Sequence, residues 1–153
     1  MNIIKKILSK KINFKIELFS KKKLLIYCSS GTAMHFNHIV KKYKKDVLFL
    51  YKDEFNFSIL VLTVFKIILS KEKNFFLNYI KTIVELYNIK VLVSDLDNYS
   101  FLYTLKNKIN SIKVFLIQNG HRGNSNDVFG KLEKNKKYKV DDFIVFNNNI
   151  KKK

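Results

Sequence analysis

The stretch Val91–Gln118, VLVSDLDNYSFLYTLKNKINSIKVFLIQ, decides the fold of this 153-residue chain. It opens on an apolar run of strand length, Val91–Ser94, and closes on another, Val114–Ile117. Strands that are apolar at every position need cover on both faces, which is typical of parallel sheets connected by helices. Between the two runs, apolar residues recur at helical spacing at Phe101, Leu102, Leu105 and Ile109. The stretch therefore predicts a strand–helix–strand unit of a parallel sheet.

The same pattern continues on both sides of this unit. Apolar positions at helical spacing predict helices around Phe36–Tyr43 and Phe76–Tyr87. Phe57–Leu69 is apolar nearly all round, so its length, and not its periodicity, favours a buried helix over a strand. Further strands are predicted at Leu24–Cys28, Val47–Tyr51 and Phe143–Phe146. We expect one Rossmann-like, three-layer α/β domain over residues 23–150, with a parallel sheet of about five strands.

The formal net charge of +18 is the second prominent feature of the sequence. A nucleic-acid surface is usually clustered and rich in Arg, because guanidinium groups match phosphates and guanine edges. Here 29 lysines are spread along the chain and Arg122 is the single arginine. Lys, Asn and Ile, which share A/T-rich codons, are all abundant. We therefore interpret most of the charge as a solvated surface and expect no specific nucleic-acid partner.

Residues 1–22 differ in composition from the rest and form a basic leader. Lysines at positions 10, 11 and 15 interrupt its apolar residues, so the segment does not resemble a removable signal peptide. Apolar residues among lysines suit a segment that lies on an anionic membrane surface, or an ordinary leader that packs along the domain. The longest apolar run, Phe57–Leu69, is too short to span a bilayer and carries Lys66. We expect a cytoplasmic protein, with peripheral contact to the inner membrane surface.

Ligands of parallel sheets bind outside the carboxyl ends of the strands, and three loops lie at such ends. The first holds Ser30, Gly31 and Thr32, whose N–H and hydroxyl groups could hold a phosphate. The loop is neither a GxGxxG nor a P-loop motif, and a turn in which Ser30 or Thr32 caps a helix is the simpler explanation.

The second loop contains Asp95-Leu96-Asp97. A carboxylate pair suits a divalent cation, as in haloacid-dehalogenase-like phosphatases and metal-dependent GT-A glycosyltransferases. The alternative is a turn at Asp95 with Asp97 or Asn98 as the N-cap of the next helix. His35 and His38 are close enough in sequence to share a metal, but no third ligand is evident beyond Cys28, which reads as a buried apolar residue. The sequence predicts no metal and no organic cofactor.

The third loop, Gln118-Asn119-Gly120-His121-Arg122-Gly123, carries the most varied chemistry. Its glycines allow close backbone approach, and Gln118 and Asn119 offer amide donors and acceptors. His121 could act as a general base, and Arg122 could hold a phosphate or a carboxylate through two hydrogen bonds. We predict this loop as part of a ligand site.

With these motifs together, the chain resembles bacterial surface-carbohydrate (surface polysaccharide) biosynthesis proteins. The resemblance rests on Asp97-Asn98 after one strand, Gln118-Asn119-Gly120 after the next, and a strand at Asp142–Phe146. That family is similar to glycosyltransferases of the GT-B fold, which have two Rossmann-like domains, and this chain would correspond to the first. The resemblance implies that Asp97, Asn98, Gln118, Asn119, Gly120 and Arg122 contact a ligand.

The resemblance implies an acceptor-side domain or fragment of a glycosyltransferase-like protein, with a glycan or lipid-linked acceptor as partner. Little sequence follows Phe146. We therefore expect the nucleotide-sugar domain to be lacking, so that a second chain would supply it and this chain would not transfer alone. Two alternatives stay open: a basic, non-enzymatic module for RNA or anionic membrane, and a metal-dependent phosphatase or transferase that uses the Asp-x-Asp pair.

Overall fold

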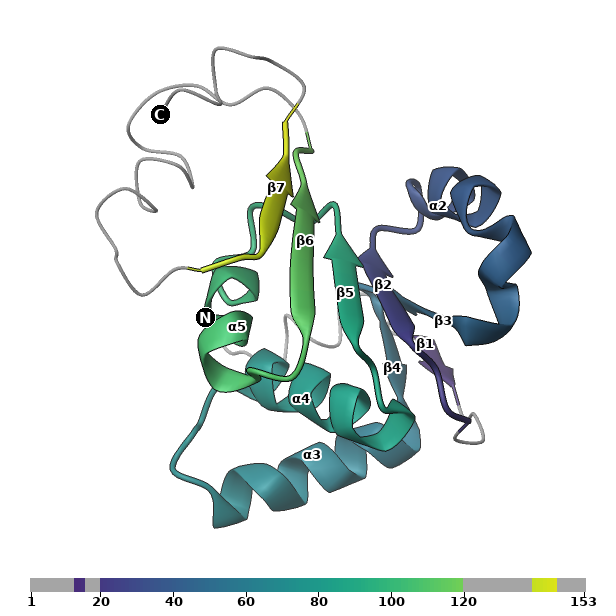
Figure 1. The fold of residues 1–153 in the computed structure, drawn as a ribbon. Coiled ribbons are helices and arrows are strands. Elements are labelled where there is room, and N and C mark those ends of the chain that lie inside the picture. Colours follow the sequence, from purple (N-terminus) through teal and green to yellow (C-terminus); the bar gives the residue numbers. More distant parts are fainter. Residues whose placement is uncertain (1–12, 16–19, 120–138, 146–153) are drawn as a thin grey trace, which may run out of the picture.

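The computed structural model of the chain describes residues 13–15, 20–119 and 139–145. Its centre is a five-stranded sheet in which every neighbouring pair is parallel, in the order β3-β2-β5-β6-β7 (Figure 1). The strands are β2 (Leu24–Cys28), β3 (Val47–Tyr51), β5 (Val91–Ser94), β6 (Lys113–Ile117) and β7 (Asp142–Ile144). The predicted strands and the Rossmann-like α/β class are therefore confirmed.

Helices connect the strands of the main sheet from β2 to β6, and two of them follow one another before β5. The helices are α2 (Ala33–Ile39), the 3₁₀ helix η1 (Lys41–Asp46), α3 (Phe57–Leu69), α4 (Phe75–Tyr87) and α5 (Leu102–Lys108). The bounds of α3 agree with the sequence prediction, and those of α4 differ by one residue. The helix expected around Phe36–Tyr43 ends early, because the chain tightens into η1 and Tyr43 leaves helical backbone angles.

The main core lies between the sheet and helices α4 and α5 (Figure 1). Alternate strand residues point to this side, among them Leu25, Leu92 and Leu116, each fully buried. From α4, Ile83 is equally buried, because apolar residues recur along one side of that helix. Burying one such side chain stabilises a fold by about 1.5–3 kcal/mol, so this layer carries most of the stability.

The opposite face of the sheet is covered less completely than the sequence predicts. Here α2 packs Ala33 and Phe36 against Ile26, over strands β2 and β3. On the neighbouring strands β5 and β6, Val93 and Ile117 point to this side and are only half-buried. Among the described residues, the second helical layer therefore covers only the β2–β3 side of the sheet.

A small second sheet was not predicted from the sequence. Strand β1 (Asn13–Lys15), inside the predicted leader, pairs in parallel with β4 (Glu54–Asn56). Asn56 ends β4 and caps α3, since its side-chain oxygen accepts a hydrogen bond from Ile59 N–H at 3.2 Å. Its own N–H donates to the Tyr79 hydroxyl at 2.8 Å. The start of α3 is thus fixed to both β1 and α4.

Helix α3 is not the buried helix that its composition suggests. Its fully buried residues are Ile59 and Thr63, and the Thr63 hydroxyl donates to the Ile59 carbonyl at 2.7 Å. All exposed residues of α3 are apolar: Phe57, Val61, Leu62, Val64, Phe65, Ile68 and Leu69. Of the helices in the described ranges, none is both long and apolar enough to cross a membrane.

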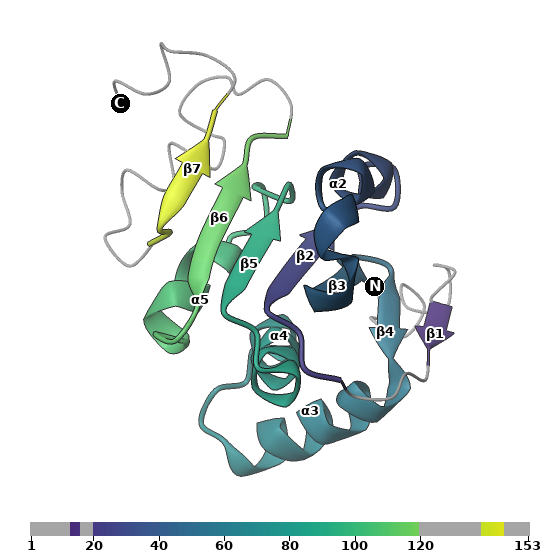
Figure 2. The ribbon, with the colours of Figure 1, turned by 45° about the vertical axis from the view of Figure 1, so that its right-hand side comes forward.

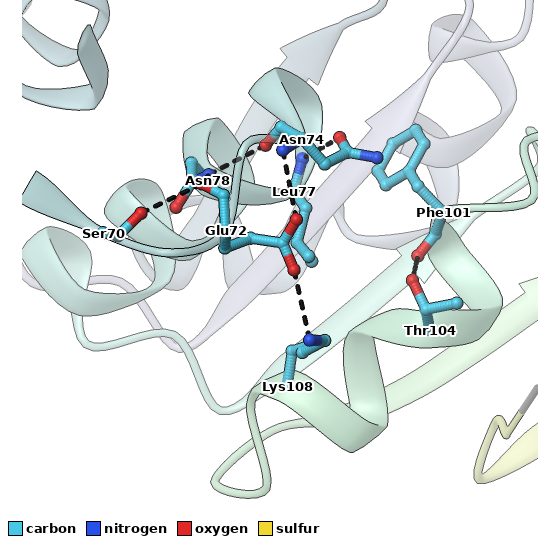
Figure 3. Close-up of polar contacts among 8 residues, drawn as sticks. All are labelled: Ser70, Glu72, Asn74, Leu77, Asn78, Phe101, Thr104 and Lys108. Carbon is cyan, nitrogen blue, oxygen red and sulfur yellow. Dashed lines mark hydrogen bonds and ion pairs between the residues drawn. The ribbon is translucent and has the colours of Figure 1, made fainter. Parts of the chain in front are cut away.

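Polar contacts in the turn after α3 tie the α3–α4 pair to α5 (Figure 3). The Glu72 carboxylate accepts the Asn74 N–H at 3.1 Å and pairs with the Lys108 ammonium of α5 at 3.1 Å. The Asn74 side chain in turn caps α4 by accepting Leu77 N–H at 3.0 Å. The hydrogen bond from Asn74, followed by Lys108, lowers the pKa of Glu72. These hydrogen bonds and the ion pair fix the position of the turn relative to α4 and α5.

Candidate functional site

The strand order brings the three predicted loops to one end of the sheet. From β2 the chain passes to β3 on one side, then returns across β2 to β5, β6 and β7 on the other. The connections therefore diverge between β2 and β5, and this is where parallel α/β sheets hold ligands. The loops after β2 and β5 flank this position, and Gln118 follows β6, the next strand. The described beginnings of the three loops therefore lie at the same end of the sheet, as the upward-pointing strand ends in Figure 2 show.

Ser94 fastens the ends of β2 and β5 together. Its hydroxyl donates to the Tyr27 carbonyl of β2 at 2.6 Å and accepts the Leu96 N–H at 3.1 Å. The side chain is completely buried, so both bonds form away from competing water. Ser94 was not predicted as a site residue, because its bond to Tyr27 depends on which strand lies beside β5.

Asp95 is the most unusual residue at this end of the sheet. Only 5% of its surface is exposed, and neither carboxylate oxygen has a hydrogen-bond partner among the described residues. Nearly all buried polar atoms in proteins are hydrogen-bonded, and an unpaired buried carboxylate costs folding free energy. Such a group marks a position where a ligand that donates hydrogen bonds would be bound favourably.

Cys28, the last residue of β2, lies close enough to Asp95 for their charges to interact. Burial, followed by the Asp95 charge, raises the pKa of the Cys28 thiol to about 12, while Thr32 lowers it through a hydrogen bond. The thiol therefore stays protonated at neutral pH and is not a nucleophile there. The prediction that Cys28 is a buried apolar residue is confirmed.

The loop after β2 satisfies most of its own hydroxyl groups. The Ser29 and Thr32 hydroxyls lie 3.0 Å apart in a hydrogen bond, and Thr32 also donates to the Ser29 carbonyl at 3.1 Å. Thr32 is the N-cap residue of α2, as predicted, but its side chain makes no capping hydrogen bond. Ser30 and Gly31 are exposed, and a Cβ at Gly31 would contact nothing within 4 Å.

The prediction that a residue of the loop after β5 caps α5 is wrong. Helix α5 starts only at Leu102, with Phe101 at the N-cap, because a series of turns separates it from β5. Asp97 is 1% exposed and has partners, and its carbonyl accepts the Tyr103 hydroxyl at 2.7 Å. Asn98, in contrast, is exposed.

Gln118 follows β6 and is 3% exposed, and its N–H donates to the Ile144 carbonyl of β7 at 2.8 Å. Both Gln118 and the exposed Asn119 have interaction partners. Gly120, His121 and Arg122 lie outside the described residues, so the proposed general base and anion contact stay predictions.

Metal binding receives no support from the described part of the chain. It contains no cluster of three His, Cys, Asp or Glu side chains that could hold an ion. His35 and His38 are exposed on α2. Within the described ranges, Asp95 has no hydrogen-bond partner whereas Asp97 has partners, so the two carboxylates differ in their surroundings.

Comparison with known proteins adds one match. Residues 115–153 match the sequence model of a family described as "putative O-antigen biosynthesis protein". The match starts inside β6 and includes Gln118 and β7. No curated protein and no solved structure shows significant similarity to the chain. The C-terminal part of the chain is therefore similar to proteins named for surface-carbohydrate biosynthesis.

Proposed function

We propose that the chain is the acceptor-side domain of a glycosyltransferase-like protein in surface polysaccharide biosynthesis. The observation that carries this proposal is the match of residues 115–153, which start in the strand whose carboxyl end borders the candidate site. The partners would be a glycan or lipid-linked acceptor and a second chain that contributes the nucleotide-sugar side.

The geometry of the site supports a sugar as ligand. Asp95 offers two unpaired carboxylate oxygens, and neighbouring hydroxyl groups of a sugar are donors that could satisfy both. Charge-assisted hydrogen bonds of this type are about twice as strong as neutral ones. Gln118, Asn98 and Arg122 would contact the rest of the ligand, with Arg122 on the diphosphate of a lipid-linked acceptor.

The first experiment measures sugar binding at Asp95. We would titrate the protein with methyl glycosides of common hexoses and with N-acetylglucosamine linked to farnesyl diphosphate, using ligand-observed NMR. We expect Asp95→Asn to weaken binding about tenfold, because it removes the charge from these hydrogen bonds. Asp53→Asn is the matched control, since Asp53 also follows a strand of this sheet, β3, and is exposed. Failure of every probe to bind would contradict the proposal.

A second variant separates the two parts of the acceptor. We expect Arg122→Ala to weaken binding of the diphosphate-linked sugar about tenfold, because one charged pair is lost, and to leave methyl glycosides unchanged. An equal loss for both probes would contradict the role of Arg122 at the diphosphate. Unchanged sugar affinity in Asp95→Asn would place the sugar elsewhere in the protein.

A further inference from the structure

Helix α3 presents an apolar face to solvent that the fold does not use. Phe57, Val61, Val64, Phe65 and Ile68 follow helical spacing and lie on one side of the helix. Phe65 is 60% exposed and Ile68 is 67% exposed. An exposed patch of this kind marks a surface that contacts another molecule or a membrane.

A row of lysines lies at the amino end of the sheet. Lys23, Lys90 and Lys113 precede or begin β2, β5 and β6, and all three are exposed. Backbone hydrogen bonds connect them from strand to strand, since Lys113 N–H donates to the Lys90 carbonyl and Lys90 N–H to the Lys23 carbonyl, each at 2.9 Å. Neighbouring strands are about 4.8 Å apart, so these positive charges form a row across the amino ends of the strands.

Among the described residues, few carboxylates lie near this row of lysines. Asp46 pairs with Lys23 at 3.7 Å, and Asp141 pairs with Lys106 at 3.0 Å. Near α3 the carboxylate of Glu85 forms an ion pair with Lys66, while Lys71 and Lys73 beyond the end of the helix are exposed. The remaining lysines leave this end of the molecule positive.

The apolar helix and the lysine row occupy the same end of the molecule. In Figures 1 and 2 the arrowheads of β2, β5 and β6 point upward, whereas α3 lies at the bottom, on the side of the strand beginnings. Helix α2 lies at the upper end in both views. Apolar and cationic surface together are the composition of a helix that lies in the plane of an anionic bilayer.

We propose that α3 and the lysines at the amino end of the sheet dock this domain on an anionic membrane surface. The apolar side chains of α3 enter the interface, and the lysines contact lipid headgroups, each worth about 1 kcal/mol near the surface. A second copy of the chain fits this surface less well, because each copy carries a net charge of +18. RNA would bind the lysines but would leave the apolar face of α3 exposed to water.

Because the chain contains no tryptophan, a single introduced tryptophan can report insertion into a membrane directly. Phe65→Trp places a single reporter on the exposed face of α3. With vesicles of 30% phosphatidylglycerol and 70% phosphatidylcholine, we expect a blue shift of its emission and quenching by brominated lipid. Met34→Trp, at an equally exposed position on α2, is the control and should show neither change. Unchanged emission from the Phe65→Trp protein would overturn the proposal.

Co-sedimentation with the same vesicles separates the two contributions. We expect Phe65→Ser/Ile68→Ser to reduce binding at least about tenfold, because two apolar side chains no longer enter the interface. Lys90→Gln/Lys113→Gln should reduce it by about tenfold or more and flatten its salt dependence. Met34→Ser/Ile39→Ser on α2 is the matched control, with less than a twofold change expected.

Three results would overturn this inference. The first is equal binding to vesicles of pure phosphatidylcholine. The second is a dimer that the Phe65→Ser/Ile68→Ser variant disperses while vesicles bind neither protein. The third is binding of poly-uridine RNA in place of vesicles. Because no sugar is present in these experiments, their outcome is independent of the proposed function.

Docking through α3 also has a consequence for the candidate site. Since α3 and the carboxyl ends of the strands lie at opposite ends of the sheet, the site would face the aqueous side (Figure 1). Of the two acceptors proposed for the site, this orientation favours a glycan over the membrane-embedded diphosphate of a lipid-linked acceptor.

Discussion

The two ends of the sheet differ in which side chains they bury and which they expose. At the carboxyl end, polar side chains are buried, with Ser94 completely enclosed and Asp95 exposed by only 5%. At the amino end, Lys90 and Lys113 are exposed, and the adjacent α3 turns Phe65 and Ile68 toward solvent. Globular folds usually bury apolar groups and expose polar ones, so each end departs from this rule in one respect. The departures mark the two surfaces where we propose contacts with other molecules.

The largest expected effect tests whether α3 contributes its outer face to stability. Ile83→Ala on α4 removes a fully buried side chain and should lower the free energy of unfolding by about 2–5 kcal/mol. Ile68→Ala on the outer face of α3 should change it by less than about 0.5 kcal/mol. Urea denaturation of both variants measures the difference. A large loss from Ile68→Ala would show that another part of the chain covers this face.

The second effect tests whether the carboxyl end is closed to reagents. With its pKa raised from 9.0 to about 12, the Cys28 thiol forms far less thiolate than in the unfolded chain. At pH 8 we expect a thiol-reactive disulfide reagent to react at least about 100-fold more slowly with the folded protein than in guanidinium chloride. Comparable rates would contradict the burial of Cys28.

The same shift predicts a dependence of stability on alkaline pH. Because folding raises the pKa of Cys28, its contribution is fully present below pH 9 and is lost as the pH rises toward 12. The Cys28→Ala variant should therefore lose less stability than the parent protein over this range. Thermal unfolding of both proteins at a series of pH values measures the difference, and parallel curves would contradict the shift.

The third effect concerns the unpaired carboxylate. Asp95→Asn replaces a buried charge by a neutral group of the same shape, so we expect the free protein to gain about 1–2 kcal/mol. The exposed Asp53→Asn should change stability by less than about 0.5 kcal/mol. Urea denaturation measures both. Destabilisation by Asp95→Asn would show that the carboxylate has a partner in the folded protein.

The smallest effect concerns the ion pair that links the α3–α4 turn to α5. Glu72→Gln should cost less than about 1 kcal/mol at pH 7, because both partners are partly exposed. Since folding lowers the pKa of Glu72, its contribution is present above pH 4.5 and is lost as the pH falls through the folded value. The difference in stability between the two proteins should thus be smaller at pH 3 than at pH 7, which chemical denaturation measures.

Much of the fold could be predicted from the sequence because its strands are apolar runs between turn residues. The strands, α3 and α4 were located to within about two residues. The β1–β4 pair was missed, since β1 lies among lysines and neither segment is longer than three residues. The exposure of α3 was also missed, because a helix that is apolar all round gives no indication of which side faces water.

The candidate site was predictable in its position but not in its chemistry. Gln118 and the loops after β2 and β5 were identified because polar residues follow apolar strands. Asp95 was considered as one half of a cation-binding pair or as a turn residue, and its lack of partners among the described residues depends on how the neighbouring strands pack. The prediction that Asp97 or Asn98 caps α5 was wrong, because turns separate that helix from β5, and Thr32 stands at the N-cap of α2 without a side-chain capping bond.

The sequence by itself determined the parallel α/β class, because strand and helix periodicities are local properties of the chain. In the sequence the lysines are spread along the whole chain and form no cluster. Only the tertiary structure decided that Lys23, Lys90 and Lys113 share one edge, because neighbouring strands bring distant residues within hydrogen-bonding distance. It also decided that Asp95 is buried without a partner and that α3 is exposed. Burial depends on every element packed around a residue, and no local pattern contains that information.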